Sequence, residues 1–403
     1  MNIRPILAAL RRHRTVTFLV ALEIALACAV LCNACFLIAG RIRTMHMVSG
    51  IDEKSLAFIS LNGYDASRAG ELNARVVAGL SSIPGVKTVG IISNLPFAGP
   101  SNEGVTTDPS GLRYEYMVSM YAGDAASLRA LGLHLVAGRA PSSDDYQPID
   151  TYYPDDSLVL ISRSLADHLW PGSDAIGKEL WSGKFHYRVV GVVEHLSAGW
   201  PEMQAAAGRD WSLFIPVLPG SKLSGTYVVQ ADPAELPRVF RDVVAAMPKI
   251  APDAVLDHNG SGMVSDLRDR YFDGDRAMIK ILLGVILALM LVTALGIVGL
   301  ASFWVQQRRK QIGIRRAIGA TRGDILRYFH TENFLIVTIG IVMGIVLAYA
   351  LNLIMMRVYE VTLLPLAYLG IGALVLWLLG QLAVLGPALR AAAVPPVVAT
   401  RSV

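Results

Sequence analysis

Four apolar runs constrain this chain more than any other feature, because each is long enough to cross about 30 Å of hydrocarbon as a helix. The runs cover approximately 16–39, 278–305, 334–355 and 367–389. Only 17% of the residues are charged and 53% are hydrophobic, which is too apolar for an ordinary soluble chain of 403 residues. The residues between the first two runs have ordinary soluble composition. We therefore predict an α-helical membrane bundle of four transmembrane helices with one inserted α+β domain.

The distribution of Lys and Arg predicts the topology of these helices. Four arginines precede the first run, namely Arg4, Arg11, Arg12 and Arg14. A second basic segment, 307–333, separates the second and third runs and holds seven Lys or Arg residues. Cationic segments beside membrane spans stay in the cytoplasm. We therefore expect both termini and segment 307–333 in the cytoplasm, and the large soluble domain on the other side of the membrane.

The expected domain boundaries follow from this topology. Residues 1–40 are predicted to form an interfacial amphipathic helix, with Ile3, Ile6, Leu7 and Leu10 as its apolar stripe, and the first transmembrane helix. The first run is longer than the apolar core of a cleaved signal peptide, so we interpret it as a retained helix. Residues 41–277 form the exported domain, which ends in a charged helical stalk at 265–276, and 278–403 form the remaining spans.

Two parts of the exported domain share one pattern. Strand, helix and strand are predicted at 56–61, 66–82 and 86–92, and again at 226–230, 233–247 and 254–257. Two such βαβ halves fit a split ferredoxin-like subdomain. The insertion between them, about 113–217, is predicted to form a β-rich lobe with strands at 114–120, 158–161, 187–193 and 212–217 and short helices at 125–131 and 164–170.

Sequence patterns for catalysis, metal binding and nucleic-acid binding are weak. Residues 172–178 match the phosphate-loop pattern GxxxxGK, but Glu179 follows in place of the Ser or Thr that would hold magnesium. Cys28, Cys32 and Cys35 share one helical face without a nearby His or carboxylate, which favours packing over metal binding. The net charge of +4 comes from membrane-flanking segments, so no nucleic-acid partner is expected. We predict a non-enzymatic chain that binds no metal or cofactor itself, with the lipid bilayer as its surroundings.

The basic segment is predicted to fold as two helices around a sharp corner. On a helical projection, Arg308, Arg309, Arg315 and Arg316 cover one face, and Ile314, Ala317 and Ile318 cover the other. Ile312 lies in the middle of the basic face, where it would be an apolar knob suited to a pocket on a partner with an acidic rim. The alternative is a topological anchor whose arginines meet lipid phosphates. Gly319 is expected to end the first helix, and Thr321 with Asp324 resembles a capping box that begins the next.

A stripe of small residues lies in the third span. Gly340, Gly344 and Ala348 follow one another at spacings of four residues. Small residues at this spacing allow two helix backbones to approach closely. The stripe therefore predicts tight helix packing, either within the bundle or across a dimer.

With these motifs in place, the chain resembles the MacB/FtsX-type ABC transporter permeases. Segment 309–325, RKQIGIRRAIGATRGDI, is similar to the family's cytoplasmic signature, and 387–401 is similar to its closing motif. In the exported domain, 131–139, 165–178 and 187–193 resemble the MacB-like periplasmic core domain. The resemblance extends over almost the whole chain. It also accounts for the GxxxxGK pattern, which then belongs to the β-rich lobe.

The resemblance implies a dimeric permease of a type VII, mechanotransmission ABC transporter in a bacterial inner membrane. A separate nucleotide-binding subunit, which carries ATP and magnesium, would press on a coupling helix at about 308–319. The implied ATPase-coupling residues are Arg308, Arg309, Gln311, Ile312, Arg315, Arg316, Gly319, Thr321 and Asp324. Gln311 departs from the family, which usually has Glu there. A second departure, from the MacB branch, is that this sequence carries no pattern of a nucleotide-binding domain, so we expect the ATPase to be a separate polypeptide.

The expected function is export of a peptide, antibiotic or toxin from the periplasm, through an adaptor and an outer-membrane duct. The second permease would be another copy or a related chain. Lipoprotein release and regulation of cell-wall hydrolases are alternatives within the class. A membrane receptor is a different class, but it needs a cytosolic output domain, and only about fourteen residues follow the last apolar run. A membrane-anchored scaffold without energy coupling is the remaining alternative.

Overall fold

The computed structural model describes residues 14–110, 116–149, 154–200, 208–220, 223–359 and 363–395. These form two compact units, described separately below: a membrane unit of Met1–His46 with Gly274–Val403, and a soluble unit of Met47–Asp273. The predicted interfacial helix at the N-terminus and the end of the closing motif lie outside the described residues.

The first sheet of the soluble unit confirms the ferredoxin-like prediction. Its strand order is β12-β1-β11-β2, and β13 also pairs with β1. The neighbouring strands are antiparallel. The bounds are β1 Leu56–Asn62, β2 Val86–Ile91, β11 Thr226–Ala231, β12 Val255–Leu256 and β13 Gly262–Met263. Helices α3, Ala69–Ser81, and α6, Leu236–Ile250, connect the strands of the two halves and pack against the sheet and each other.

The second sheet forms the β-rich lobe, with the order β3-β4-β10-β7-β9-β5, while β6 pairs with β10 and β8 with β9. Its strands are β3 Asn102–Val105, β4 Tyr116–Gly123, β5 Leu135–Gly138, β6 Gln147–Pro148, β7 Asp156–Ser162, β8 Glu179–Ser182, β9 Phe185–Val193 and β10 Ser212–Leu218. The short helices are α4, Ala125–Leu131, and α5, Arg163–Leu169. The four expected strands are present, whereas β3, β5, β6 and β8 were not predicted because each is too short to show a clear alternation.

The GxxxxGK pattern forms a turn that leads into β8. Gly177 has a φ of +77°, which favours glycine, and its N–H donates to the Val189 carbonyl at 2.8 Å. The Lys178 N–H donates to the Ala175 carbonyl at 3.1 Å. The first amide is therefore bonded to strand β9 and the second within the turn, as the interpretation as part of the β-rich lobe requires.

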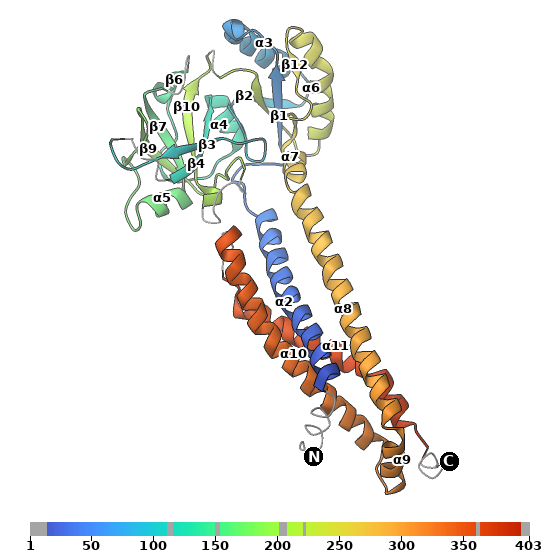
Figure 1. Ribbon diagram of the computed structural model, residues 1–403. Helices are drawn as coiled ribbons and strands as arrows, with labels where there is room; N and C mark the ends of the chain where they lie inside the picture. The colour runs from blue at the N-terminus through green and yellow to red at the C-terminus, as the bar shows by residue number, and fades with distance from the viewer. Residues whose placement is uncertain are drawn as a thin grey trace. The chain divides into compact units, whose positions relative to one another are not determined.

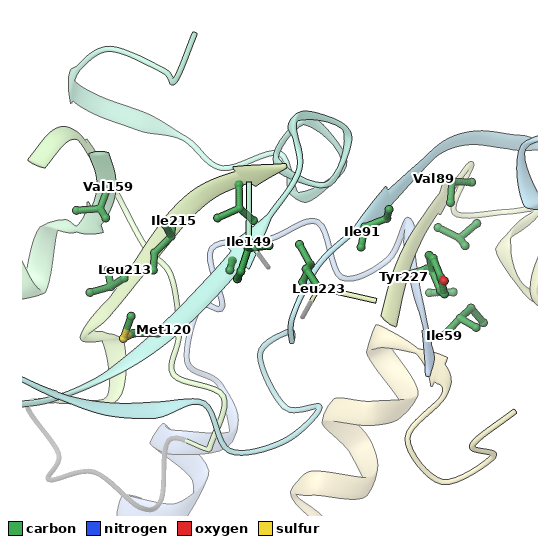
Figure 2. Packing of buried hydrophobic residues seen from close by; sticks show 14 of the residues in the cluster. Ile59, Val89, Ile91, Met120, Ile149, Val159, Leu213, Ile215, Leu223 and Tyr227 are labelled. Carbon is green, nitrogen blue, oxygen red and sulfur yellow. The ribbon is translucent and has the colours of Figure 1, made fainter. Parts of the chain in front are cut away.

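One continuous hydrophobic core joins the two sheets of the soluble unit. Figure 2 shows Ile59, Val89, Ile91 and Tyr227 in the ferredoxin-like part of this core and Met120, Val159, Leu213 and Ile215 in the β-rich part. Leu223 and Ile149 lie between these groups. Because the two parts share a core, the β-rich lobe packs against the ferredoxin-like part and does not form an independent domain.

The membrane unit confirms the four predicted spans. Its helices are α2 Arg14–Met45, α8 Asp273–Gln307, α10 Arg322–Tyr359 and α11 Leu366–Ala392, with the short helix α9, Arg309–Ala317, between α8 and α10. All four long helices are apolar and long enough to cross a membrane. Helix α10 packs along α2 and α11, as Figure 1 shows.

The expected stalk is helical but interrupted. Helix α7 covers Val264–Tyr271, and Phe272, with φ −89° and ψ 7°, separates it from α8. The charged residues of this segment are therefore divided between the short helix α7, up to Arg270, and the start of α8, from Asp273.

Candidate functional site

The chain reverses direction between α8 and α10, and α9 forms the corner. Arg308 has φ −103° and ψ 9°, which breaks the helix after Gln307, and α9 begins directly after it. Gly319 has a φ of +105°, so it adopts the left-handed conformation that ends α9 as predicted. Its N–H donates to the Arg316 carbonyl at 3.2 Å, and the Ala320 N–H donates to the Arg315 carbonyl at 3.0 Å.

The expected capping box begins α10. The Asp324 N–H donates to the Thr321 hydroxyl oxygen at 3.2 Å, and the Thr321 N–H donates to Asp324 Oδ2 at 3.0 Å. The Thr321 hydroxyl also donates to Asp324 Oδ2 at 2.6 Å. An Asp in place of the usual Glu therefore completes the box, and the corner is held at both ends by local interactions.

The predicted exposed knob, Ile312, is buried. Its side chain is only 5% exposed and belongs to an apolar cluster that we call the corner cluster. The other buried members are Val305, Ile325, Phe329, Ala388, Ala391, Ala392 and Val394, which come from α8, α10 and the end of α11. The expectation that Ile312 projects toward a partner was wrong, because the side of α9 that carries Ile312 turns toward α10 and α11. Arg308 and Arg316 lie on this side, whereas Arg309 and Arg315 of the predicted basic face are exposed.

Arg308 forms a buried ion pair that the sequence did not predict. Its Nη1 donates to Oε1 and Oε2 of Glu332, each at 3.1 Å, and lies 3.4 Å from the Tyr328 hydroxyl. Glu332 is 1% exposed and the Arg308 side chain 13% exposed. Arg308 also lies over the Trp304 ring, at 5.2 Å from its centroid. The sequence feature that could have indicated this ion pair is Glu332 itself, because it is one of only two acids in the basic segment.

Arg316 also binds within the chain. Its Nη1 donates to the carbonyl oxygens of Ala392 at 3.0 Å and Val394 at 2.9 Å. These carbonyls lie at the end of α11, where a helix leaves acceptors without partners and favours positive charge. Arg316 thus joins α9 to the end of α11.

The opposite face of α9 is exposed and carries a pair of isoleucines. Ile314 is 43% exposed and Ile318 is 81% exposed. Polar and charged residues surround them, and the exposed ones include Arg309, Lys310, Gln311, Arg315, Thr321, Arg322 and Asp324. We call this the outer face of α9. Of the predicted coupling residues, Arg308, Ile312 and Arg316 therefore lie inward, and the others lie on or beside the outer face.

The small residues of α10 pack within the chain. A Cβ on Gly340 would lie 2.7 Å from the Ile24 Cβ, and one on Gly344 would lie 2.5 Å from the Cys28 Cβ and 2.8 Å from the Ala25 carbonyl oxygen. Ala348 is fully buried, and its carbonyl accepts a hydrogen bond from Asn33 Nδ2 at 3.2 Å. The sequence left open whether this stripe serves the bundle or a dimer, and in this structure it packs against α2.

In the soluble unit, Arg268 joins the segments where the chain enters and leaves that unit. Its guanidinium donates to Glu53 Oε1 at 2.5 Å and to the Met47 carbonyl at 2.6 Å. It also lies over the rings of Phe97 and Phe272, at 5.0 and 5.8 Å. Phe97 has a φ of +67°, an uncommon conformation for a bulky residue, and its N–H donates to the Gly199 carbonyl at 3.0 Å. We call these contacts the Arg268 clamp.

Charged groups of the β-rich lobe show clear pKa shifts. The Arg139 guanidinium, by its hydrogen bonds to Asp145, lowers the pKa of that carboxyl to about 2. Burial raises the pKa of Asp210, although it accepts hydrogen bonds from His195 Nδ1 at 3.0 Å and the Leu196 N–H at 2.9 Å. Both are structural arrangements of loops. In the parts of the chain that the structure describes, no three His, Cys, Asp or Glu residues gather as a metal site would require.

Comparison with known proteins identifies the family. Residues 17–246, more than half of the chain, match the MacB-like periplasmic core domain, and 283–396 match the FtsX-like permease C-terminal family. A macrolide export ATP-binding/permease protein MacB from Bdellovibrio bacteriovorus is 28% identical over 211 residues, which are 50% of this chain and 32% of that protein. The MacB of a Shewanella species is 23% identical over 370 residues, 86% of this chain and 52% of that protein.

The chain thus spans between about a third and a half of the length of these curated relatives. Among solved structures, the periplasmic region of MacB from Actinobacillus actinomycetemcomitans has a TM-score of 0.33 at 15% identity, covering 54% of this chain and 94% of that one. The extracellular domain of the noncanonic ABC-type transporter YknZ has a TM-score of 0.32 at 12% identity, covering 50% and 100%. On the strength of the two family matches, the chain belongs to the FtsX-like permeases that carry a MacB-like periplasmic core domain.

Proposed function

We propose that this chain is the permease subunit of an ATP-driven, mechanotransmission ABC transporter in a bacterial inner membrane, with α9 as its contact for an ATPase. The observation that carries the proposal is the outer face of α9. An exposed pair, Ile314 and Ile318, lies on a short helix between two membrane helices and is surrounded by positive charge. Exposed apolar anchors within a polar rim are typical of protein interfaces.

The inward contacts of α9 support a mechanical role for this helix. Ile312 packs in the corner cluster, Arg308 is paired with Glu332 on α10, and Arg316 holds the end of α11. A force on the outer face would therefore reach α10 and α11 through packed side chains and not through a flexible loop. The Arg268 clamp supports a mechanical role in the soluble unit as well. It links the segment by which the chain enters that unit to the segment by which the chain leaves it.

The proposed cargo follows from the relatives. Those relatives are named as macrolide exporters, and we extend to this chain the export of an antibiotic, peptide or toxin from the periplasm, with an adaptor and an outer-membrane duct as further partners. A second permease subunit would use surfaces other than the α10 stripe, which α2 covers. Helix α8 offers one, since Ile281, Leu287 and Leu291 on it are exposed.

The test is binding of an ATPase by the full chain. We would co-express it with the ABC ATPases of the same genome, purify it in detergent, and measure the retained ATPase and its stimulated hydrolysis. Replacing both Ile314 and Ile318 with Asp should weaken ATPase binding at least about tenfold, because truncating an interface anchor costs about 2 kcal/mol or more. Repeating the hydrolysis assay with added macrolides or peptides would identify the cargo class.

Val255→Asp is the matched control, since Val255 is an exposed apolar residue of the soluble unit. It should leave both ATPase retention and hydrolysis unchanged. Wild-type retention of an ATPase by the Ile314→Asp, Ile318→Asp variant would contradict the assignment of the outer face as the docking surface.

A further inference from the structure

A small pocket lies between α9 and the first turns of α10. Its polar lining consists of Arg308, Gln311, Arg315 and Tyr328, and apolar members of the corner cluster line the rest. The pocket is open at its mouth, and its cavity volume is about 30 Å³. It opens beside the outer face of α9: Gln311 and Arg315 of that face line it, whereas Ile314 and Ile318 do not. The proposed apolar anchors for an ATPase, Ile314 and Ile318, therefore leave this pocket unexplained.

The charges around the pocket leave one positive charge in excess. Glu332 balances Arg308, through contacts of 3.1 Å from Nη1 to both carboxylate oxygens. The Arg315 guanidinium lies over the Tyr328 ring, at 5.1 Å from its centroid. Within the described residues Arg315 has no carboxylate partner within ion-pair distance. The pocket is thus suited to one negative charge.

The hydrogen-bonding groups of the lining narrow the ligand further. Arginine presents several N–H donors in a planar fork, the Gln311 amide adds two, and the Tyr328 hydroxyl adds one. None of the lining residues is an acid. A monoanion with several acceptor oxygens fits this set, and a phosphate group is one of the anions whose geometry matches the arginine fork.

The depth of the pocket indicates where the phosphate comes from. Val305 is the last apolar residue of α8, and Arg308 follows it by three residues, or about 4.5 Å along a helix. On α10, Tyr328 precedes the apolar run that begins at Phe334 by six residues, or about 9 Å. The headgroup layer on each side of the hydrocarbon is about 5–8 Å thick. Arg308 therefore falls within this layer and Tyr328 just beyond its outer edge, so we expect the polar lining at the outer edge of the headgroup layer, beside the lipid phosphates.

We propose that this pocket binds the phosphate of an anionic phospholipid headgroup. A bound phosphate would accept hydrogen bonds from Gln311 and Arg315 of α9 and from Tyr328 of α10, so it would fasten α9 to α10 at the membrane surface. The lipid assignment shares Gln311 and Arg315 with the outer face of α9 but not its apolar anchors, Ile314 and Ile318. Lipid retention and ATPase retention are therefore measured separately.

Native mass spectrometry of the full chain in detergent tests the proposal. The probes are phosphatidylglycerol, phosphatidylcholine and inorganic phosphate, each added to delipidated protein. Wild type should retain phosphatidylglycerol in preference to phosphatidylcholine. Arg315→Gln should weaken that retention about tenfold, because it removes a charge-assisted hydrogen bond. Arg315 is exposed, so this variant should keep the wild-type thermal midpoint.

Arg309→Gln is the matched control, since Arg309 is an exposed arginine of the same helix that does not line the pocket. It should change phosphatidylglycerol retention less than about twofold. Equal losses in the two variants, or equal retention of the two lipids by wild type, would overturn the proposal. Retention of inorganic phosphate that Arg315→Gln abolishes, without any preference for phosphatidylglycerol, would keep the phosphate site but overturn the lipid as its source.

Discussion

The two faces of helix α9 carry similar residues in opposite environments. The inward face has Ile312 and Arg316, buried or bonded to the ends of other helices. The outer face has Ile318 and Arg315, with Ile318 81% exposed. The helical projection placed all four arginines on one face, whereas in the structure Arg309 and Arg315 lie on the outer face and the other two lie inward. Each face therefore combines isoleucine with positive charge, and such a projection does not say which face is buried. The neighbouring helices make that choice, since only the inward face meets a carboxylate, helix-end carbonyls and an apolar cluster.

The largest loss of stability is expected from removing Glu332, the acid that pairs with Arg308 on the inward face of α9. Glu332→Ala leaves Arg308 buried without its partner, which should destabilise the chain by about 3–5 kcal/mol. The measurement is the thermal midpoint of the full chain in detergent. The control is Arg308→Met combined with Glu332→Leu, which removes both charges and should recover most of the loss. A single Glu332→Ala variant as stable as wild type would show that the pair is solvated and the inward face is not an interior.

A smaller loss of stability is expected from truncating Ile312, on the inward face, and almost none from truncating Ile318, on the outer face. Ile312→Ala should cost about 2–4 kcal/mol, because it leaves a cavity in the corner cluster. Ile318→Ala, the same change on the outer face, should alter stability by less than about 0.5 kcal/mol. Urea or thermal unfolding of the full chain gives both values. Similar losses in the two variants would mean that α9 does not have the inward and outer faces described here.

The smallest effect is expected from an ion pair whose arginine is half exposed, Arg139 with Asp145 in the soluble unit. The pKa of Asp145 is lowered from 3.8 to about 2, so its contribution is present above pH 4 and is lost as the pH falls toward 2. Asp145→Asn should therefore destabilise the chain by about 1 kcal/mol at pH 7, after allowance for solvent screening. Thermal midpoints of wild type and variant, followed from pH 7 to pH 2.5, should move closer together as the pH falls, because the contribution of Asp145 is lost only as the pH approaches its folded pKa. A difference that does not change with pH would exclude the ion pair as its cause.

Much of the fold could be predicted because its signals are local. The four spans follow from run length, the corner from Gly319 and the Thr321–Asp324 box, and the ferredoxin-like sheet from two strand-helix-strand patterns. Each depends on neighbours within a few residues in the chain. The short strands β3, β5 and β8 depend instead on partners elsewhere in the sheet, so their own residues carry little signal.

The place of the candidate site in the chain could be predicted from the sequence, but which face of α9 is buried could not. The sequence by itself determined that a rigid, basic, two-helix corner joins the second and third spans, because capping and helix-ending residues act locally. Only the tertiary structure decided that Ile312 is a core residue, that Arg308 belongs to Glu332, and that the small residues of α10 pack against α2. These outcomes depend on which helix lies across from each residue. That choice is made by packing and charge pairing between segments far apart in the chain, which periodicity within one segment does not encode.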